Sequence, residues 1–419
     1  MMPPMALRIL HTSDWHLGHV FHGVEREYEH RIFLDWLLDT LESEAVDALL
    51  IAGDVFDAAN PPASATKLWY HFLGRAHARA PRLQVVVIGG NHDSAARLEA
   101  PRPILDELGP LHVVGGLPRV NGDFDVDRLI VPLRDRQDAI AAWVLAVPFL
   151  RPADLPAVGQ DADPLTEGTR ALYQRVLQNL HTRRTPDQAV IAMGHCYMVG
   201  TQLSESSERK VLGGNQHPLP HDIFGDDITY AALGHLHVPQ RVGGKENIRY
   251  SGAVLPLSFD ARSVHHSVML VETEDEKMTS IRELPVPRGL PLLSVPNGGP
   301  LPLEVVLNAL QALPDRGDGP DEQRPLLEVY VALDKPEPAL RKRIDEAMEG
   351  KEARLVRIAP PVFNGTGEAL PDSGAVGLSE LSIEQVFLLK YKKQHGNKPS
   401  PEMLAAFHEL HDHVAQEGA

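Results

Sequence analysis

The stretch "VDALLIAGDVFD", Val46 to Asp57, decides the fold class. Its mostly apolar first part stops abruptly at a glycine followed by an aspartate. Continuous apolar runs of this length, rich in Val, Ile and Leu, are typical of strands buried on both faces. The same form occurs four more times in about the first 260 residues, always ending at polar residues. These other runs are "LRIL" before "HTSDWHLG", "LQVVVIGG" before "NHD", "AVIAMG" before "HCY" and "ITYAALG" before "HLH".

Helical segments separate these runs. The segments 29–45 and 64–80 carry apolar residues at a spacing of three to four, which is the period of a helix with one buried face. Alternation of strand and helix predicts an α/β fold. In open α/β sheets a ligand binds outside the carboxyl ends of the strands. We therefore expect the polar residues that follow the five runs to converge in one place.

The pattern changes after about Pro285. The sequence from 290 to 359 predicts strand, helix, strand, helix and strand, without the polar groups that follow the earlier runs. A Gly, Pro and Ser-containing linker and two amphipathic helices come next. These helices could pack on each other as a hairpin or dock against a partner helix. We expect a catalytic domain at 1–285, a small α/β domain at 286–362, a linker at 363–379 and C-terminal helices for partner binding at 380–419.

Composition narrows the classes of function. The chain has 419 residues and a formal net charge of -17, which argues against a nucleic-acid binder that works by charge alone. Nucleic acid is still compatible as a substrate, because bound metals or a partner protein can supply positive charge. The single cysteine, Cys196, excludes an intrachain disulfide and fits a reducing compartment. Since the sequence has neither a membrane-spanning apolar run nor a signal-peptide pattern, we expect a cytoplasmic protein.

The residues that follow the five runs form a set suited to metal binding. Carboxylate, imidazole and amide oxygen together suit Mn, Fe, Zn or Mg, and the lack of cysteine clusters argues against structural zinc or an iron-sulfur site. The set is too large for one tetrahedral ion, whereas two ions bridged by a carboxylate account for it and leave room for water or substrate. The candidate ligands are Asp14, His16, Asp54, Asn91, His195, His235 and His237.

Each motif is weak by itself. "GNHD" alone is compatible with a turn, and Asp14 alone with a helix cap. The prediction depends on the order of the motifs, on their position at strand ends and on a glycine before each of the later groups. Glycine permits a tight turn that brings the next side chain inward without a clash at Cβ. The glycines in question are Gly53, Gly90, Gly194 and Gly234.

The series D-x-H, GD, GNHD, GH and GHxH, from Asp14 to His237, resembles the calcineurin-like metallophosphoesterase superfamily. The flanking stretches "RILHTSDWHLG", "VPFLRP" and "SGAVLPLSFD" narrow the resemblance to the DNA repair nucleases of that superfamily. It covers essentially the first 260 residues, and over the remainder it is a match of layout. The resemblance implies a two-sheet αββα sandwich with a small α/β capping domain and a C-terminal helical hairpin.

The resemblance also implies how the candidate ligands are shared between two divalent metal ions, with Mn²⁺ as the favoured ion. The first ion is held by residues matching Asp14, His16 and His237, the second by those matching Asn91, His195 and His235, and the counterpart of Asp54 bridges them. Two such ions lower the pKa of a bridging water, so that hydroxide can attack the phosphodiester in line.

His92 matches a family histidine that faces the scissile phosphate and is not a ligand. We expect it to stabilise the charge of the transition state or to protonate the leaving sugar oxygen as a general acid. Asp93 is expected to orient the His92 imidazole, as a carboxylate fixes the tautomer of a histidine. Asp57 stands where archaeal members carry a second histidine, and its role is left open.

The implied function is that of a metal-dependent DNA nuclease, both a double-strand exonuclease and a single-strand or hairpin endonuclease. It would act in DNA repair, recombination and replication-associated hairpin processing with a coiled-coil, SMC-like ATPase bound through the C-terminal helices. The family suggests a homodimer of this subunit within a heterotetramer. His19, His22 and Arg26, after "DWHLG", are candidates for contact with the DNA backbone, although exposed loop polarity explains them equally well.

Two other classes of function are compatible with this core. The first is a phosphatase or nucleotide phosphodiesterase. Protein phosphatases of the superfamily carry an arginine directly after GDxxD, whereas Ala58 stands there in this chain, which disfavours that class. The second is a scaffold that has lost its metals, and the presence of every expected ligand disfavours it.

Overall fold

The computed structural model describes residues 6–105, 109–156, 158–159, 163–201 and 218–363, with isolated residues between 384 and 408. The chain divides into two compact units, which change over in the sequence at Leu292, except that 319–325 group with the first unit. The predicted linker and the two predicted C-terminal helices lie almost entirely outside the described residues. Within the described ranges, no helix is long and apolar enough to span a membrane.

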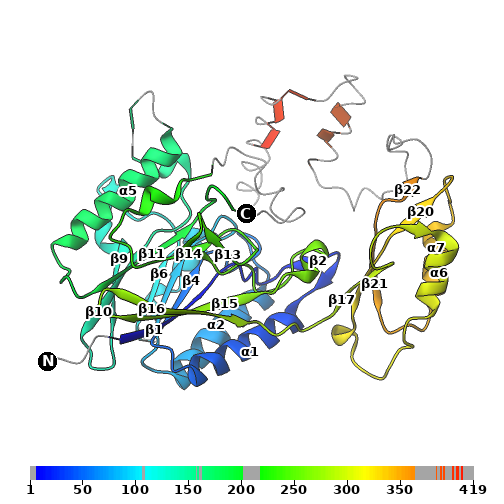
Figure 1. The fold of residues 1–419 in the computed structure, drawn as a ribbon, viewed down its shortest axis with the longest axis horizontal. Coiled ribbons are helices and arrows are strands. Elements are labelled where there is room, and N and C mark those ends of the chain that lie inside the picture. The colour runs from blue at the N-terminus through cyan, green and yellow to red at the C-terminus, as the bar shows by residue number, and fades with distance from the viewer. Residues whose placement is uncertain are drawn as a thin grey trace. The chain divides into compact units, whose positions relative to one another are not determined.

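The first unit contains two six-stranded sheets (Figure 1). The first sheet has the order β16-β15-β1-β4-β5-β6, with β1 at Ala6–Thr12, β4 at Ala48–Ala52, β5 at Gln84–Ile88, β6 at Leu111–Val114, β15 at Ser267–Glu274 and β16 at Lys277–Pro285. The second has the order β13-β14-β12-β11-β10-β9, with β9 at Ile130–Arg134, β10 at Ile140–Ala146, β11 at Ala189–His195, β12 at Tyr230–Gly234, β13 at Gln240–Val242 and β14 at Lys245–Tyr250.

The central strands of both sheets run parallel. In the first sheet β1, β4, β5 and β6 are parallel, and β15 and β16 extend it in antiparallel fashion. In the second sheet β10, β11, β12 and β14 are parallel. The carboxyl ends of the predicted strands therefore fall at one edge of each sheet.

Strand β4 shows why its sequence is apolar without alternation. Ala48, Leu50 and Ala52 lie in the core shared with the second sheet. Leu49 and Ile51 point to the other face and pack with helices α1, Glu27–Ser43, and α2, Ala63–Arg79. Because successive side chains of a strand point to opposite faces, a strand covered on both sides is apolar at every position.

Helices cover both outer faces of the stacked sheets. Helices α1 and α2 cover the first sheet, and their observed bounds agree with the predicted segments to within two residues. Helix α5, Pro164–His181, buries Leu172 and Val176 against the second sheet. Figure 1 shows α5 on the opposite side of the sheets from α1 and α2. The predicted two-sheet αββα sandwich is confirmed.

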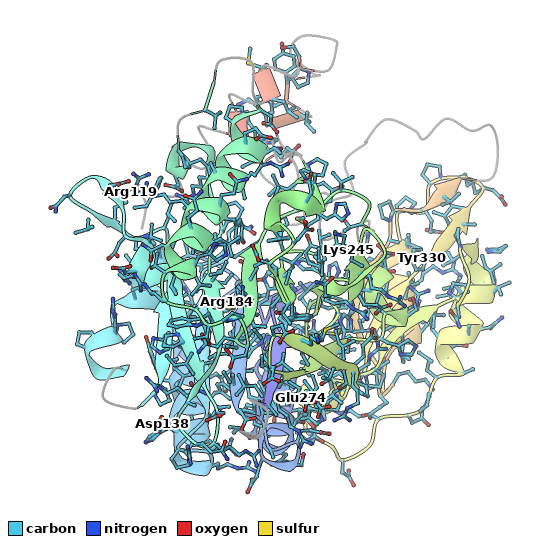
Figure 2. The ribbon with its side chains drawn as sticks, turned by 60° about the vertical axis from the view of Figure 1, so that its left-hand side comes forward. Arg119, Asp138, Arg184, Lys245, Glu274 and Tyr330 are labelled. Carbon is cyan, nitrogen blue, oxygen red and sulfur yellow. The ribbon has the colours of Figure 1, made fainter. Side chains whose placement is uncertain are left out.

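Short elements connect the larger ones. They are β2 at Val20–Phe21 and β3 at Val24–Glu25, which form a hairpin; α3 at Ala95–Glu99 and α4 at Arg102–Leu105; the hairpin of β7 at Arg119–Val120 and β8 at Asp123–Phe124; and 3-10 turns at Val126–Leu129, Pro152–Asp154, His221–Phe224, Asp260–Ser263 and Asp321–Gln323. Charged side chains such as Asp138, Arg184 and Lys245 lie at the periphery of the ribbon, as expected for a solvated exterior (Figure 2).

The second unit has the predicted order of strand, helix, strand, helix and strand. The elements are β17 at Leu292–Val295, β18 at Leu301–Pro302, α6 at Leu303–Gln311, β19 at Leu326–Val329, β20 at Val331–Leu333, α7 at Leu340–Ala347, β21 at Arg354–Ile358 and β22 at Val362–Phe363. The single strand expected over 325–333 is divided at Tyr330, whose backbone N–H donates to Val295. Its halves join separate three-stranded sheets, β17-β19-β21 and β18-β20-β22.

Candidate metal centre

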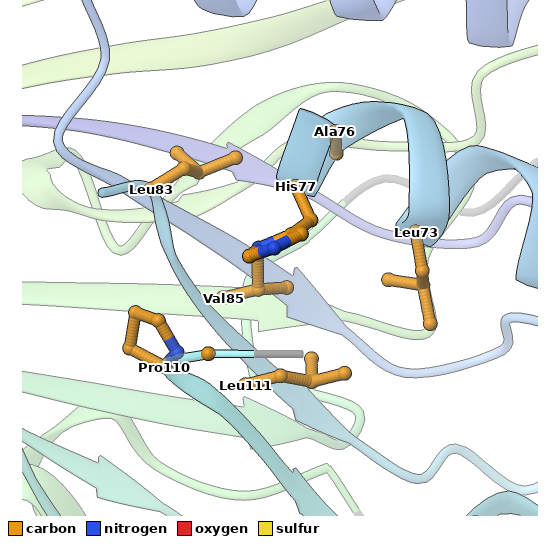
Figure 3. A pocket seen from close by; sticks show the side chains of 8 residues that line it. Leu73, Ala76, His77, Leu83, Val85, Pro110 and Leu111 are labelled. Carbon is orange, nitrogen blue, oxygen red and sulfur yellow. The ribbon is translucent and has the colours of Figure 1, made fainter. Parts of the chain in front are cut away.

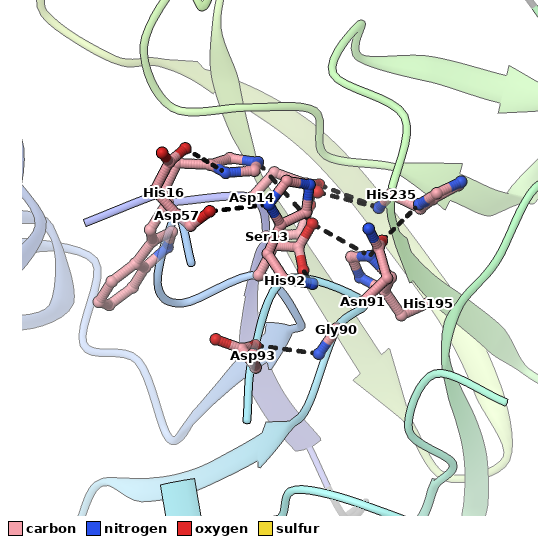
Figure 4. Close-up of polar contacts among 12 residues, drawn as sticks. Ser13, Asp14, His16, Asp57, Gly90, Asn91, His92, Asp93, His195 and His235 are labelled. Carbon is pink, nitrogen blue, oxygen red and sulfur yellow. Dashed lines mark hydrogen bonds and ion pairs between the residues drawn. The ribbon is translucent and has the colours of Figure 1, made fainter. Parts of the chain in front are cut away.

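The polar residues after the five predicted strands converge at one place, although the strands belong to two different sheets. Strands β1, β4 and β5 come from the first sheet, and β11 and β12 from the second. The Nδ1 of His195, the last residue of β11, lies 2.8 Å from the carbonyl oxygen of Ala52, the last residue of β4. Stacking of the two sheets thus joins their carboxyl-end loops into one cluster (Figure 4).

A first group consists of Asp14, His16 and His237. Their ligand atoms lie within 4.8 Å of one another, and all three residues are buried. The Nε2 atom of His16 is buried without a hydrogen-bond partner in the described structure. Such an atom costs about 1–3 kcal/mol when nothing binds it, so its position here favours a bound cation.

A second group is arranged around Asn91. Its Oδ1 lies 3.0 Å from Nε2 of His195 and 2.9 Å from Nδ1 of His235. The rings of the two histidines are edge to face, with centroids 5.2 Å apart. An amide oxygen and two imidazole nitrogens therefore face one small volume, as three ligands of one ion would.

Asp54 faces both groups. Its Oδ2 lies 3.3 Å from Nε2 of His195 and 3.8 Å from Nε2 of His16. Its Oδ1 accepts the backbone N–H of His92 at 2.9 Å, which fixes the orientation of the carboxylate. This is the position that a carboxylate shared by two ions requires.

The backbone is strained at four of the candidate ligands. Asp14, His16, Asp54 and His235 have φ angles of 52°, 48°, 50° and 102°, in the left-handed region that favours glycine. A residue held there costs on the order of 1–3 kcal/mol, and such residues cluster at functional sites. Backbone bonds hold two of the turns, since the N–H groups of Asp14 and His16 donate to the carbonyls of Gly53 and Asp54 at 3.0 and 3.1 Å.

The glycines before the ligands serve two different needs. Gly53 has a φ of +88° and provides the predicted turn. Gly90 and Gly234 are required by close approach instead, because a Cβ would lie 2.1 Å from Oδ1 of Asp54 at Gly90 and 1.9 Å from the carbonyl oxygen of Ala52 at Gly234.

Replacing Gly234 by alanine tests this packing. The new methyl group would collide with the backbone of β4, which cannot move away as a flexible side chain could. We expect Gly234→Ala to lower the free energy of unfolding by about 1–3 kcal/mol, as overpacking does, and to weaken metal binding by displacing His235. Urea unfolding and metal titration measure the two effects, and Gly244→Ala, where nothing lies within 4 Å of a Cβ, is the control for substitution of a loop glycine. Unchanged values for both effects in Gly234→Ala would contradict this packing.

Charge and burial set the protonation of the cluster before any cation binds. Burial opposes ionisation of His195, but the neighbouring carboxylates of Asp54 and Asp14 raise its pKa to about 9. Burial, together with the charge of Asp54, raises the pKa of Asp14 to about 7. Although burial opposes it, the imidazoles led by His195 hold the pKa of Asp54 well below its usual range. Burial lowers the pKa of His235 to about 3, which leaves that ring neutral.

Metal affinity should therefore rise with pH. A cation needs neutral His195 and ionised Asp14, and both groups hold their protons to a higher pH than usual. Between pH 7 and 9 release of one proton predicts about a tenfold gain in affinity per pH unit, and below pH 7 release of two protons predicts a steeper dependence. Calorimetric titration in buffers of different ionisation enthalpy counts the protons, and an affinity constant across this range would contradict the assignment.

His92 lies beside the cluster, but Asp93 does not orient it as expected. The His92 Nδ1 donates to the backbone carbonyl of Asp57 at 2.8 Å. The Asp93 carboxylate instead accepts the backbone N–H groups of Gly90, Val55 and Phe56 at 2.9, 3.1 and 2.9 Å. Asp93 thus joins the loop after β5 to the loop after β4, and the expectation for its role is wrong because the backbone amides satisfy its oxygens.

Two of the three candidates for DNA contact lie near the cluster surface. His19 is partly exposed, and its Nδ1 lies 2.9 Å from Oδ1 of Asp57. The Nε2 atom of His19 has no hydrogen-bond partner among the described residues. His22 has a φ of 48° in the β2–β3 hairpin, and its ring stacks on Phe259 with centroids 5.7 Å apart.

Arg26 differs from the other two. Only 2% of the residue is exposed. Its guanidinium donates to both carboxylate oxygens of Glu29 and to the carbonyl of Pro256. Burial and occupied donors argue against contact between this side chain and DNA. No local sequence pattern indicated this burial, because the partner Pro256 is distant in the chain.

Sequence reasoning missed the residues that support the cluster from below. The His30 Nε2 lies 3.0 Å from the carbonyl oxygen of Trp15, the residue between the candidate ligands Asp14 and His16. The Trp15 ring packs edge to face against Phe33 and Phe72. The helical spacing of Phe33 and Phe72 marked them as core residues, but nothing in the sequence indicated which loop they would hold.

A hollow against the first sheet contributes nothing to this centre (Figure 3). It is lined mainly by apolar residues of α2, of β5 and of the segment that enters β6, and it contains none of the candidate ligands. The lining residues are Leu73, Ala76, His77, Leu83, Val85, Gly109, Pro110 and Leu111.

Two family models match the chain. The model described as calcineurin-like phosphoesterase matches residues 7–239, which contain the whole cluster. The model described as type 5 capsule protein repressor C-terminal domain matches residues 288–395.

Curated relatives align along most of the chain. A protein of Rhodobacter capsulatus, named as the D-type subunit of the nuclease SbcCD, is 43% identical over 83% of this chain and 86% of its own length. Proteins of the same name from Escherichia coli strain K12 and Bacillus subtilis are 33% and 31% identical and cover 91% and 99% of this chain and 92% and 100% of their own lengths. The chain therefore belongs to the calcineurin-like phosphoesterase family and, within it, to the SbcD nucleases.

Proposed function

We propose that this chain is a metal-dependent DNA nuclease, the phosphodiester-hydrolysing subunit of a complex with an SbcC-type coiled-coil ATPase. The observation that carries the proposal is the meeting of seven side chains of metal-ligand type at one edge of the sandwich, in a chain related over most of its length to SbcD nucleases. Hydrolysis of double-strand ends and of single-strand or hairpin DNA is the activity proposed.

Two groups of ligands suit two divalent cations. One cation would be held by Asp14, His16 and His237 and the other by Asn91, His195 and His235, with Asp54 shared. The unpartnered Nε2 of His16 and the shared position of Asp54 support this division. Oxygen and imidazole donors without thiolate suit Mn²⁺, which we propose as the ion used.

The bound cations would supply Lewis acidity, which lowers the pKa of water and neutralises phosphate charge. The chain supplies a proton donor beside them. Although burial opposes it, the Asp54 carboxylate and the Asp57 carbonyl raise the pKa of His92, so this imidazole holds a proton closer to neutral pH. With Nδ1 bound to Asp57, the Nε2–H of His92 is the group left to protonate the leaving sugar oxygen.

The remaining parts of the chain are assigned by the same proposal. Residues 1–285 would form the nuclease domain, 286–362 a capping domain that guides the duplex, 363–379 a linker and 380–419 the helices that bind the ATPase. His19 and His22 are the proposed contacts to the DNA backbone. We place the protein in the cytoplasm, as a homodimer within a heterotetramer.

A metal-supplemented cleavage assay tests the function. The chain, stripped with a chelator and purified, is given Mn²⁺ and offered a hairpin oligonucleotide, linear duplex DNA and p-nitrophenyl phosphate, with and without the ATPase subunit and ATP. We expect DNA cleavage only with the metal. Turnover of the phosphate monoester without DNA cleavage would identify a phosphatase, and no turnover of any substrate would identify a scaffold.

A further inference from the structure

Asp57 contacts three histidines at once. Its Oδ1 lies 3.1 Å from Nδ1 of His16 and 2.9 Å from Nδ1 of His19. Its backbone carbonyl accepts from Nδ1 of His92 at 2.8 Å. Figure 4 shows Asp57 beside His16 at the side of the cluster away from His235. No other described carboxylate has hydrogen bonds to two imidazoles of this cluster.

The contact with His16 determines which ring nitrogen faces the centre. A carboxylate accepts hydrogen bonds, so Nδ1 of His16 carries the proton and Nε2 carries the lone pair. Nε2 is the atom that is buried without a partner and lies 3.8 Å from Oδ2 of Asp54. A ring whose far nitrogen is held in this way presents its lone pair in one fixed direction, which strengthens metal binding.

A cation held directly by Asp57 is the competing interpretation. Ligand atoms of Asp57, His16 and His92 also lie within 4.8 Å of one another. However, the nitrogens of His16 and His92 that face Asp57 donate hydrogen bonds to it, and a protonated nitrogen has no lone pair for a metal. The hydrogen bonds therefore favour an acceptor of imidazole protons over a third metal site.

We infer that Asp57 is a positioning residue, whose carboxylate fixes His16 as a ligand of the first cation. The inference rests on the proposed two-cation nuclease. The carboxylate acts on only one of the two ligand groups, because Asn91, His195 and His235 receive no bond from Asp57 among the described contacts. The bond to His92 comes from the backbone carbonyl and survives any substitution of the side chain.

The substitution Asp57→Asn isolates the carboxylate, since the amide has nearly the same size. Calorimetric titration of the full chain with Mn²⁺ should show two sites in the wild type. In the variant we expect one site weakened by about 10- to 100-fold, as measured when a histidine loses its carboxylate partner, and the other unchanged. Cleavage of a hairpin oligonucleotide should recover when Mn²⁺ is raised enough to fill the weakened site.

Two matched variants serve as controls. Asp138→Asn removes the same charge from an exposed side chain and should leave both affinities unchanged. His19→Gln removes the second imidazole on Oδ1 of Asp57 and should also leave metal binding unchanged, since His19 belongs to neither ligand group.

The outcomes separate the inference from the proposal beneath it. Two sites of wild-type affinity in Asp57→Asn would overturn the inference, and so would loss of both sites together with a lower melting temperature, because Asp57 would then support the fold as a whole. A wild-type chain that binds no pair of cations would instead overturn the proposed function.

Discussion

Asp54→Asn is expected to empty both metal sites and to reduce DNA cleavage by at least about 10³-fold. The carboxylate of Asp54 lies between the two ligand groups, 3.3 Å from Nε2 of His195 and 3.8 Å from Nε2 of His16. The amide has the same shape but no charge, and its NH₂ cannot bind a cation. Loss of metal-assisted charge stabilisation amounts to several kcal/mol, and each 1.4 kcal/mol is a factor of ten in rate.

Single-ligand variants provide the comparison for Asp54→Asn. His237 lies with Asp14 and His16, whereas His235 lies with His195 and Asn91. His237→Ala and His235→Ala should therefore each weaken a different one of the two sites. Metal content after gel filtration, measured by plasma emission spectroscopy, distinguishes the cases. If Asp54→Asn retained two ions, Asp54 would not be shared.

His92→Ala is expected to keep both cations and to lose about 10²- to 10⁴-fold in hydrolysis of DNA, the usual contribution of a general acid. Metal binding should survive because His92 supports Asp54 through its backbone N–H, which alanine also has. Loss of the ring removes the proton donor whose pKa is raised despite burial, by the Asp54 carboxylate and the Asp57 carbonyl.

The leaving group provides the control for His92. A p-nitrophenolate leaves without being protonated, so cleavage of bis(p-nitrophenyl) phosphate should be affected much less than cleavage of DNA by the same variant. Equal losses on both substrates would contradict the role of acid. A fall of metal content along with activity would make His92 a ligand instead.

Much of the fold could be predicted from the sequence because local patterns report burial. The run from Ala48 to Ala52 is apolar at every position because both faces of β4 are covered, and the periods of α1 and α2 mark their buried stripes. The assignment of strands to two sheets came from the resemblance. Both kinds of sheet arrangement contain the same apolar runs, so the runs alone could not distinguish them.

The candidate ligands could be predicted because glycine, strand end and ligand side chain are adjacent in sequence. The contacts that orient them could not, since they depend on distances between loops. Asp93 follows His92 directly, yet its oxygens are satisfied by amides of Val55 and Phe56 from another loop. Arg26 looked like an exposed loop residue, but its partner Pro256 is 230 positions away.

The most direct test of the two-cation centre is anomalous X-ray diffraction from crystals of this chain grown with Mn²⁺. We predict two peaks on either side of the Asp54 carboxylate, one bounded by Asp14, His16 and His237 and the other by Asn91, His195 and His235. A single peak, or a peak bound by Asp57 and His92 in place of these groups, would contradict the centre described here.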